Sequence, residues 1–217
     1  MRKLVIIGAG GFGQEAVWVA ESMNSILPPD DRWEILGYLD DDDSSLGKES
    51  YGFKVLGKPS AFNPAGREVW FHCAIGNNIK RERVAQSLSA RHLRSATLIH
   101  PSVIIARDVS VGGGSFVGAG SILSPNCCVG RYVLINQRVS IGHDASLDDF
   151  SQACPGAQIN GFAKVCRGAL IGSNASIHFQ KTVGEHAVVG SNSQVIRNVA
   201  PRTTVSGVPA TVLMRSQ

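Results

Sequence analysis

The sequence predicts two folds in one chain of 217 residues, a small α/β half-fold followed by a parallel β-helix. A six-residue repeat that runs through the second half predicts the β-helix. An apolar strand, a glycine-rich loop and a helical run near the start predict the α/β part. Both patterns use glycine, which is abundant at 24 residues.

The repeat extends from Ile99 to Ala200 as seventeen consecutive blocks of six residues without an insertion. The first position is Ile, Val or Leu in sixteen blocks, Ala153 being the exception, and the fifth is Val, Ser, Cys or Ala in sixteen, Lys181 being the exception. Three blocks close a coil of eighteen residues, so residues i and i+18 stack at the strand spacing of about 4.8 Å. Neighbouring coils then bury each other's apolar side chains, as in other solenoids.

The first half of the chain has the pattern of alternating strands and helices. We expect strands at 3–7, 35–39 and 69–74 and helices at 14–23 and 79–92. This order is typical of a Rossmann-like half-fold with a parallel sheet. We place the domain boundary so that residues 1–95 form the α/β domain and residues 96–217 form the β-helix with a C-terminal tail.

The loop after the first strand is a G-x-G-x-x-G motif made by Gly8, Gly10 and Gly13, placed between a strand and a helix as the motif requires. Free N–H groups at the start of the helix create a phosphate site. Asp40, at the end of the second strand, is placed to accept hydrogen bonds from a ribose or base. The half-fold lacks a second mononucleotide half, which favours a nucleotide-sugar over NAD; a purely structural turn is the remaining alternative.

The composition excludes several classes of protein. The net charge of +4 is spread along the chain, which disfavours a nucleic-acid partner. We find no apolar stretch of about 20 residues, as a membrane span requires, and no signal peptide, so we expect a cytoplasmic protein. The five cysteines are expected to be unpaired thiols, and no spacing of His, Cys or Asp predicts a metal site.

Among the six histidines, His143 has the pattern expected of a general base. It occupies the third position of its block, near a corner, where its side chain can point outward. Asp144 follows and can orient the ring, and imidazole titrates near neutral pH. Adding eighteen to 143 gives Gly161, whose backbone N–H, one coil above, could donate a hydrogen bond to an oxyanion that forms beside the base. The alternative is that His143 is a solvated corner residue without a catalytic role.

The chain resembles the hexapeptide-repeat sugar acetyltransferases of the bacillosamine, perosamine and sialic-acid pathways over nearly its whole length. The residues that carry the resemblance are GAGGFG at 8–13, YLDDD at 38–42, AIGNN at 74–78, IHPSV at 99–103, INQRVSIGHD at 135–144 and GVPA at 207–210. The resemblance implies a left-handed β-helix, a homotrimer with active sites between neighbouring prisms, and His143 within the catalytic segment. It also implies that acetyl-CoA is the co-substrate.

The resemblance further implies which residues bind each substrate. The nucleotide-sugar site is expected to contain Gly10, Gly11, Phe12, Asp40, Asp41, Gly76 and Ile79, with Asn136 near the sugar. Phe12 stands where some relatives have His. Gln152 stands where some relatives place a second His near acetyl-CoA, and Ser173 and Ser191 are expected beside the pantetheine arm. The cations expected near the phosphates of the coenzyme are Lys181, Arg197, Arg202 and Arg215.

These observations predict an acetyl-CoA-dependent N-acetyltransferase that acts on a nucleotide-linked amino sugar of the 4-amino-4,6-dideoxy type. The acetyl group is expected to pass directly to the amine, with His143 as base. An O-acetyltransferase acting on sialic acid or a polysaccharide unit would use the same base. A non-catalytic β-helix scaffold or nucleotide-sugar sensor is the alternative from another class.

Overall fold

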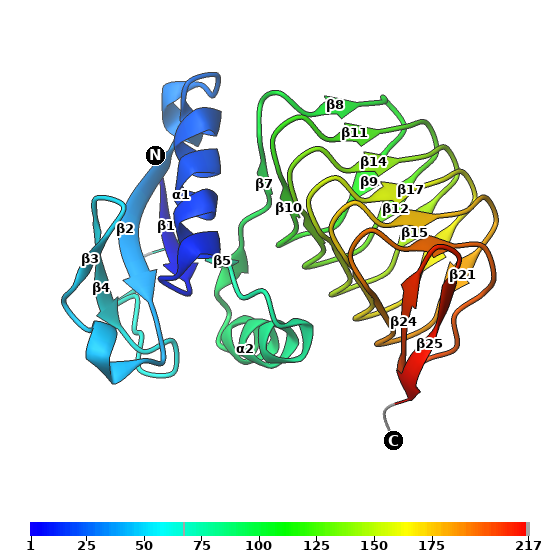
Figure 1. Cartoon of the computed structure of the whole chain (residues 1–217). Helices are drawn as coiled ribbons and strands as arrows, with labels where there is room; N and C mark the ends of the chain where they lie inside the picture. Colours follow the sequence, from blue (N-terminus) through cyan, green and yellow to red (C-terminus); the bar gives the residue numbers. More distant parts are fainter. Residues whose placement is uncertain (67, 216–217) are drawn as a thin grey trace. The chain divides into compact units, whose positions relative to one another are not determined.

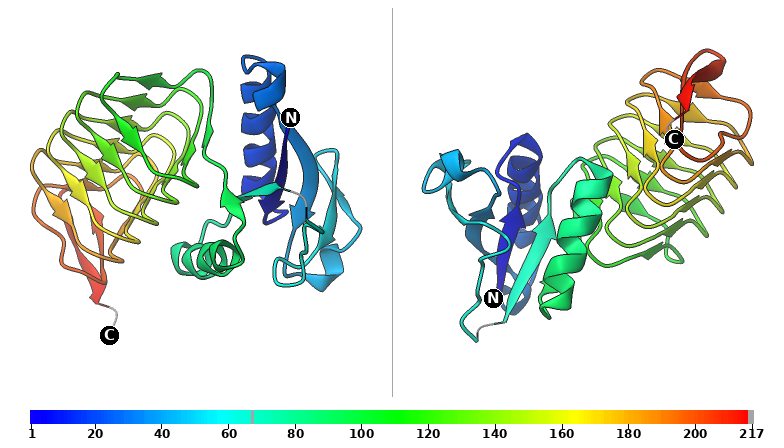
Figure 2. Two further views of the ribbon diagram at one scale, coloured as in Figure 1. Left: turned by 180° about the vertical axis from the view of Figure 1, so that it is seen from behind. Right: turned by 90° about the horizontal axis from the view of Figure 1, so that it is seen from below.

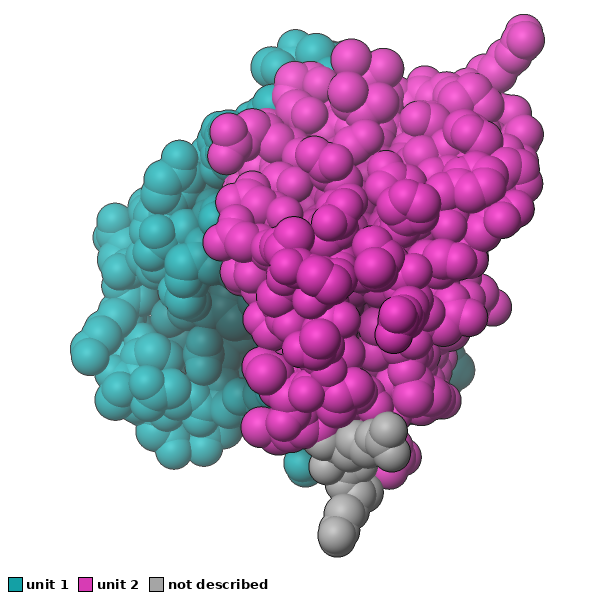
Figure 3. All heavy atoms as spheres, turned by 45° about the vertical axis from the view of Figure 1, so that its right-hand side comes forward, with its two compact units in different colours: residues 1–101 teal, residues 102–217 magenta. Residues whose placement is uncertain are grey.

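The computed structural model describes residues 1–66 and 68–215, and the chain divides into two compact units, residues 1–101 and 102–217 (Figures 1 and 3). The first unit is built on a sheet with the strand order β3-β4-β2-β1-β5-β6. Its strands are Arg2–Ile7 (β1), Trp33–Leu39 (β2), Glu49–Ser50 (β3), Phe53–Gly57 (β4), Val69–Cys73 (β5) and Arg94–Ser95 (β6). Its helices are Gly11–Asn24 (α1) and Asn78–Ala90 (α2), with 3-10 turns at Pro29–Asp31 and Asp43–Ser45.

The central strand β1 is apolar and buried because a strand in a parallel sheet is covered on both faces. It pairs in parallel with β2 on one side and with β5 on the other. The chain therefore reverses direction across the sheet at β1, and the carboxyl ends of β1 and β5 meet where such sheets bind ligands. Helix α1 buries one face, including Ala16, Val17 and Ala20. Helix α2 is capped by Asn77, whose side chain accepts a hydrogen bond from Lys80 N.

The predicted elements of this half are confirmed, with shifted ends. Helix α1 begins three residues earlier than expected, at Gly11, because the glycine loop leads directly into the first helical turn. The sequence pattern missed β3, β4 and β6, since these strands are short and lack an apolar run. His72 is fully buried, as expected of a structural histidine, and Nδ1 lies 2.9 Å from Ala96 O.

The second unit is a prism of stacked coils with three faces (Figure 2). The first face contains Phe116–Val117 (β10), Leu134–Ile135 (β13), Gln152–Ala153 (β16), Leu170–Ile171 (β19) and Val188–Val189 (β22). The second contains Ile104–Ile105 (β8), Ile122–Leu123 (β11), Ser140–Ile141 (β14), Gln158–Ile159 (β17), Ser176–Ile177 (β20) and Gln194–Val195 (β23). The third contains Ser110–Val111 (β9), Cys128–Val129 (β12), Ser146–Leu147 (β15), Lys164–Val165 (β18) and Thr182–Val183 (β21). Leu98–Ile99 (β7) belongs to the first unit and contacts α1.

The eighteen-residue stacking is confirmed by the register of every face; Ser140 pairs with Gln158, for example, and Gln158 with Ser176. Aliphatic residues at the first block position fill the interior, and those from Leu123 to Val195 are almost fully buried. We name two corners for later use. Corner A joins the first face to the second (136–139, 154–157, 172–175 and 190–193), and corner B joins the second face to the third (124–127, 142–145, 160–163 and 178–181).

The prism ends in a hairpin that the repeat did not predict. Thr203–Gly207 (β24) pairs in parallel with β22, and Ala210–Arg215 (β25) then folds back antiparallel to it. The segment GVPA, noted in the sequence, forms the turn of this hairpin. Neither helix of the described chain combines the length and apolar character needed to cross a bilayer.

The buried His72 makes the stability of the first unit depend on pH. Burial lowers the pKa of its imidazole to about 4 from the ordinary 6.5, and the charge of Arg81 contributes in the same direction. Between these values the unfolded chain binds a proton that the folded chain does not. We therefore expect the free energy of unfolding to fall by up to about 3 kcal/mol as the pH drops from 6.5 to 4, and to change no further below that for this residue.

Denaturant titrations at several pH values test this expectation. His72→Phe should flatten the decline between pH 6.5 and 4, whereas His92→Gln, at an exposed position, should leave it unchanged. An equally steep decline in His72→Phe would contradict the assignment.

Candidate functional site

The His143–Asp144 pair lies at corner B in a four-residue turn closed by the bond from Ala145 N to Gly142 O. Asp144 has a φ of 59°, which sets the carboxylate beside the preceding imidazole. His143 Nδ1 lies 2.8 Å from Asp144 Oδ2. The His143 side chain is 56% exposed. With Nδ1 bound to the carboxylate, Nε2 is the ring nitrogen left to meet a substrate.

Asn126 is a further member of this cluster that the sequence analysis missed. It lies eighteen residues before Asp144, and Asn126 Nδ2 donates to Asp144 Oδ1 at 3.2 Å. The backbone of the corner is held as well, because Asp144 N donates to Pro125 O and Phe162 N donates to His143 O. The sequence does contain a signal for Asn126, because the eighteen-residue period relates Asn126 to Asp144 as it relates His143 to Gly161.

Gly161 occupies the position directly above His143 in corner B. A Cβ at this position would lie 2.8 Å from His143 Nε2, so the glycine leaves room for the imidazole. Within residues 1–66 and 68–215, no group accepts a hydrogen bond from the N–H of Gly161. The reason is its place in the turn: the bond that closes the turn uses Ala163 N, and the second residue contributes no donor to it. Corner B therefore holds an N–H without an acceptor on the same glycine whose open Cβ position contacts the His143 ring.

The residues expected around acetyl-CoA gather on corner A and beside it. Ser173 and Ser191 stack one coil apart in corner A, and Gln152 lies on β16 just before this corner. Gln152 Oε1 and Asn136 Oδ1 are buried and have no hydrogen-bond partner among the described residues. Buried carbonyl oxygens of this kind are normally satisfied, which marks the corner as a place where a ligand N–H or O–H can bind.

Within one protomer, corner A and His143 are not brought together. The whole second face of the prism, including β14, lies between them. The structure thus separates the predicted site residues of the β-helix into two groups at opposite ends of one face.

The glycine loop of the first unit combines structural and open positions. A Cβ on Gly13 would lie 2.0 Å from Gly8 O, and one on Gly8 would lie 2.9 Å from Ala74 O, so both glycines are required by packing. Gly10 and Gly11 are exposed, and a Cβ on either would meet no protein atom within 4 Å. The protein itself therefore gives no steric reason for glycine at these two positions, where helix α1 begins.

Asp40 holds this loop rather than standing free beside it. Its Oδ2 accepts from Ala9 N at 2.8 Å and its Oδ1 accepts from Asp42 N at 3.0 Å. Ser50 Oγ donates to Ala9 O at 3.1 Å, which fixes the loop from the other side. Phe12 is half-buried on the first turn of α1.

The loop after β5 lies next to the glycine loop, and the buried guanidinium of Arg81 stabilises it. Gly76 is exposed, with open space where its Cβ would be. Arg81, fully buried on α2, donates to Ile75 O at 2.9 Å and approaches Gly76 O at 3.4 Å. Burial lowers the pKa of its guanidinium to about 10, so it remains charged at neutral pH. Its burial cannot be predicted from the sequence pattern, because a single Arg in a polar helix has the pattern of a solvated side chain.

A small pocket of about 210 Å³ lies against helix α2. Asp41, Lys80 and Arg83 contribute its charges, and Lys80 Nζ lies 3.7 Å from Asp41 Oδ2. Ile79 is 68% exposed next to it. The expected residues Gly10, Gly11, Asp41, Gly76 and Ile79 thus lie at the carboxyl edge of one sheet.

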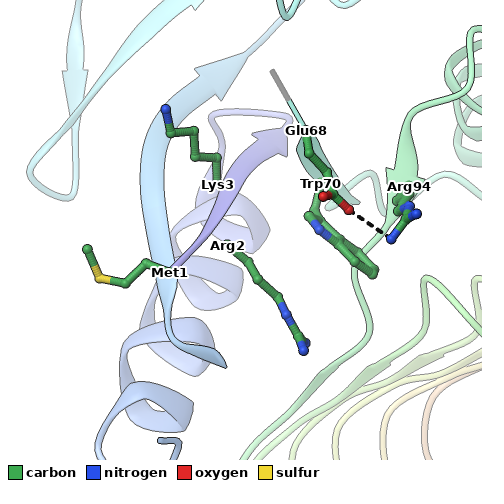
Figure 4. A pocket seen from close by; sticks show the side chains of 6 residues that line it. All are labelled: Met1, Arg2, Lys3, Glu68, Trp70 and Arg94. Carbon is green, nitrogen blue, oxygen red and sulfur yellow. Dashed lines mark ion pairs between the residues drawn. The ribbon is translucent and has the colours of Figure 1, made fainter. Parts of the chain in front are cut away.

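A larger hollow, of about 440 Å³, lies at the opposite edge of that sheet (Figure 4). The side chains of Arg2 and Arg94 lie against the Trp70 ring, and Arg94 pairs with Glu68 at 2.8 Å. This is the amino edge of the parallel strands, away from the glycine loop. It is therefore not part of the candidate site.

The remaining expected cations lie near the last coils. Arg197 and Arg202 are exposed and Lys181 is half-buried, and the side chain of Arg215 lies outside the described residues. In the described part of the chain, no group of three or more His, Cys, Asp or Glu is arranged to hold a metal ion.

Comparison with known proteins relates both units to one kind of enzyme. Residues 3–88 match the PglD N-terminal domain. The chain is 27% identical over 155 residues to GDP-perosamine N-acetyltransferase of Escherichia coli, covering 71% of this chain and 68% of the relative. It is 32% identical over 124 residues to UDP-N-acetylbacillosamine N-acetyltransferase of Bacillus subtilis, covering 55% of this chain and 52% of the relative.

Solved structures match over nearly the full length. The acetyltransferase domain of PglB from Neisseria gonorrhoeae, in complex with acetyl coenzyme A, has a TM-score of 0.88 and 28% identity over 98% of this chain and 99% of that chain. A variant of perosamine N-acetyltransferase from Caulobacter crescentus, in complex with CoA and GDP-perosamine, has a TM-score of 0.88 and 22% identity over 99% and 98%. The predicted fold class, a Rossmann-like half-fold followed by a left-handed β-helix, is confirmed. In sequence and in fold the chain is therefore similar to sugar N-acetyltransferases, and its residues 3–88 match the PglD N-terminal domain.

Proposed function

We propose that this protein transfers the acetyl group of acetyl-CoA to the amine of a nucleotide-linked sugar of the 4-amino-4,6-dideoxy type. The relatives named above act on nucleotide-linked amino sugars, and matched structures hold CoA or acetyl-CoA. The observation that carries the proposal is the pair formed by His143 and Asp144 at 2.8 Å, beside the unbonded N–H of Gly161. These are a base, its orienting group and an oxyanion donor, which acyl transfer requires.

The proposed reaction is a direct transfer. Asp144 accepts from Nδ1–H of His143 and holds the tautomer in which Nε2 is the base. Nε2 takes a proton from the amine as its nitrogen attacks the thioester carbonyl carbon. The oxyanion accepts a hydrogen bond from the N–H of Gly161. One such donor stabilises the transition state by about 3 kcal/mol in comparable enzymes. The C–S bond then breaks, and the CoA sulfur leaves with the proton held by His143.

The nucleotide-sugar is proposed to bind at the carboxyl edge of the first unit's sheet. Its diphosphate approaches Gly10 and Gly11, where a side chain would intervene and where the first N–H groups of α1 point outward. Asp40 fixes the loop through Ala9, so we assign it to positioning rather than to a contact with ribose. Arg81 supports the facing loop and adds a buried positive charge beneath it. Asn136 is proposed to contact the sugar.

The pantetheine arm is proposed to lie along corner A. It carries two amide N–H groups, and the unpartnered Oε1 of Gln152 is an acceptor of the kind such groups need. Ser173 and Ser191 would lie along the same arm. Since corner A and His143 are at opposite ends of one face, a site that uses both needs a second copy of the chain, and we propose a homotrimer in which each site forms between two prisms.

Replacing His143 should remove the base without disturbing the fold, because its side chain is exposed. We expect His143→Ala to lower kcat by about 10²–10⁴-fold, the usual contribution of a general base, with little change in KM. CoA release is measured from acetyl-CoA with UDP-, dTDP- and GDP-linked 4-amino sugars as acceptors.

His178→Ala, at another exposed corner position, is the matched control and should retain wild-type turnover. Full turnover by His143→Ala would exclude the proposed base. Transfer only to hydroxyl acceptors such as sialic acid would assign the enzyme to O-acetylation, and no transfer to any acceptor would favour a scaffold or sensor.

The glycine loop offers a second test with a matched pair of variants. Gly11→Ala places a methyl group in open space, so the thermal midpoint should stay the same or rise, since Ala favours helix over Gly. If the diphosphate approaches this position, KM for the nucleotide-sugar should rise by roughly tenfold or more.

Gly13→Ala places its methyl group against Gly8 O, and this variant should instead lose thermal stability. Thermal melts and KM values for both substrates distinguish the two effects. An unchanged KM for the nucleotide-sugar in Gly11→Ala would place the diphosphate elsewhere.

A further inference from the structure

Two phenylalanines continue the column of side chains that contains His143. Phe179 lies two coils above His143 in corner B, with Gly161 between them, and Phe162 lies beside that gap. The rings of His143 and Phe162 are 5.2 Å apart and nearly perpendicular at 89°, and those of Phe162 and Phe179 are 5.5 Å apart. The three rings form a continuous wall around the position where Gly161 has no side chain.

Both phenylalanine rings are open to solvent. Phe162 is 48% exposed and Phe179 is 43% exposed. A pair of large apolar rings costs free energy in water, in proportion to the apolar area left exposed, and covering that area is favourable. Because the rings lie beside the exposed His143, we expect an apolar part of the bound substrate to cover them.

The size of the gap follows from the stacking. Neighbouring coils are separated by about 4.8 Å, so the missing side chain at Gly161 opens a notch about one strand spacing high between His143 and Phe179. Nε2 of His143 reaches one edge of the notch, since it lies 2.8 Å from the place of a Gly161 Cβ. At the notch, Nε2 of His143 is therefore a polar group and the two rings are the apolar surface, while Gly161 itself has an N–H without an acceptor among the described residues.

We infer that Phe162 and Phe179 form the acyl pocket and limit the transferred group to acetyl. This inference rests on the proposed function. In the transfer step the carbonyl oxygen faces the N–H of Gly161 and the amine faces Nε2 of His143. The remaining substituent of the carbonyl carbon, the methyl group, then lies against the rings. A propionyl or butyryl chain needs further room in the direction that Phe179 and Phe162 close.

The test compares acetyl-, propionyl- and butyryl-CoA as donors for wild type, Phe162→Ala and Phe179→Ala. One additional methylene changes kcat/KM by roughly 10–200-fold in a closely fitting pocket. We expect wild type to disfavour propionyl-CoA by at least about tenfold. Each variant should raise the propionyl-to-acetyl ratio of kcat/KM by about tenfold or more and should keep measurable acetyl transfer.

Ile122→Ala is the matched control, an exposed apolar residue (43%) on the second face and outside the column. It should leave the acyl ratio unchanged. The oligomeric state of every variant is measured by light scattering, because the two rings could instead only join subunits.

An unchanged acyl ratio in both Phe variants would overturn the inference, whether or not the assembly weakens. Wild type that uses butyryl-CoA as well as acetyl-CoA would overturn it too. These outcomes differ from failure of the proposed function itself, in which wild type transfers no acyl group from any donor.

Discussion

The larger unit depends on one interaction, the parallel hydrogen-bonded stacking of residue i on residue i+18. It sets the interior, because each aliphatic side chain lies over another of its kind from the neighbouring coil. It also sets the corners, where identical turns recur and align side chains in columns. His143, Gly161 and Phe179 form one such column, and Asn126, Asp144 and Phe162 form the column beside it. The repeat thus places the proposed base, its neighbouring carboxylate, an N–H without an acceptor among the described residues and two aromatic rings, without an inserted loop.

The same repetition separates the two groups of proposed site residues within one copy of the chain. Each corner is a straight column of turns. Corner A and corner B therefore lie at opposite ends of the second face in every coil. The unpartnered oxygens of Gln152 and Asn136 lie on one side and His143 on the other. A cyclic assembly brings opposite corners of neighbouring prisms together, which gives the proposed trimer a chemical purpose. In the first unit the charged side chains of Asp40 and Arg81 instead stabilise two loops, the glycine loop and the loop after β5.

Much of this architecture could be predicted because nearly every six-residue block has an aliphatic first position and a small fifth position. The eighteen-residue period alone predicts Gly161 above His143. The terminal hairpin, β3 and β4 escaped prediction, since short strands without an apolar pattern resemble loops. Arg81 escaped because burial of a charged side chain depends on tertiary packing. Asp40 is predicted to accept hydrogen bonds from a ribose or base; its two backbone hydrogen bonds, to Ala9 N and Asp42 N, could not be predicted because they depend on the fold of the loop. The roles proposed for His143, Gly161 and the corner A residues in catalysis and binding remain predictions.

The central claim is that each active site combines His143 of one copy with corner A of another. Subunits carrying His143→Ala and subunits carrying Ser173→Trp, each with its own tag, can be co-expressed and the mixed trimers isolated through both tags. In a cyclic mixed trimer one interface in three pairs an intact base with an intact corner A. The account predicts that each variant alone is inactive and that the mixed trimers recover about one third of wild-type turnover. Mixed trimers as inactive as the separate variants would contradict it and place the whole site within one protomer.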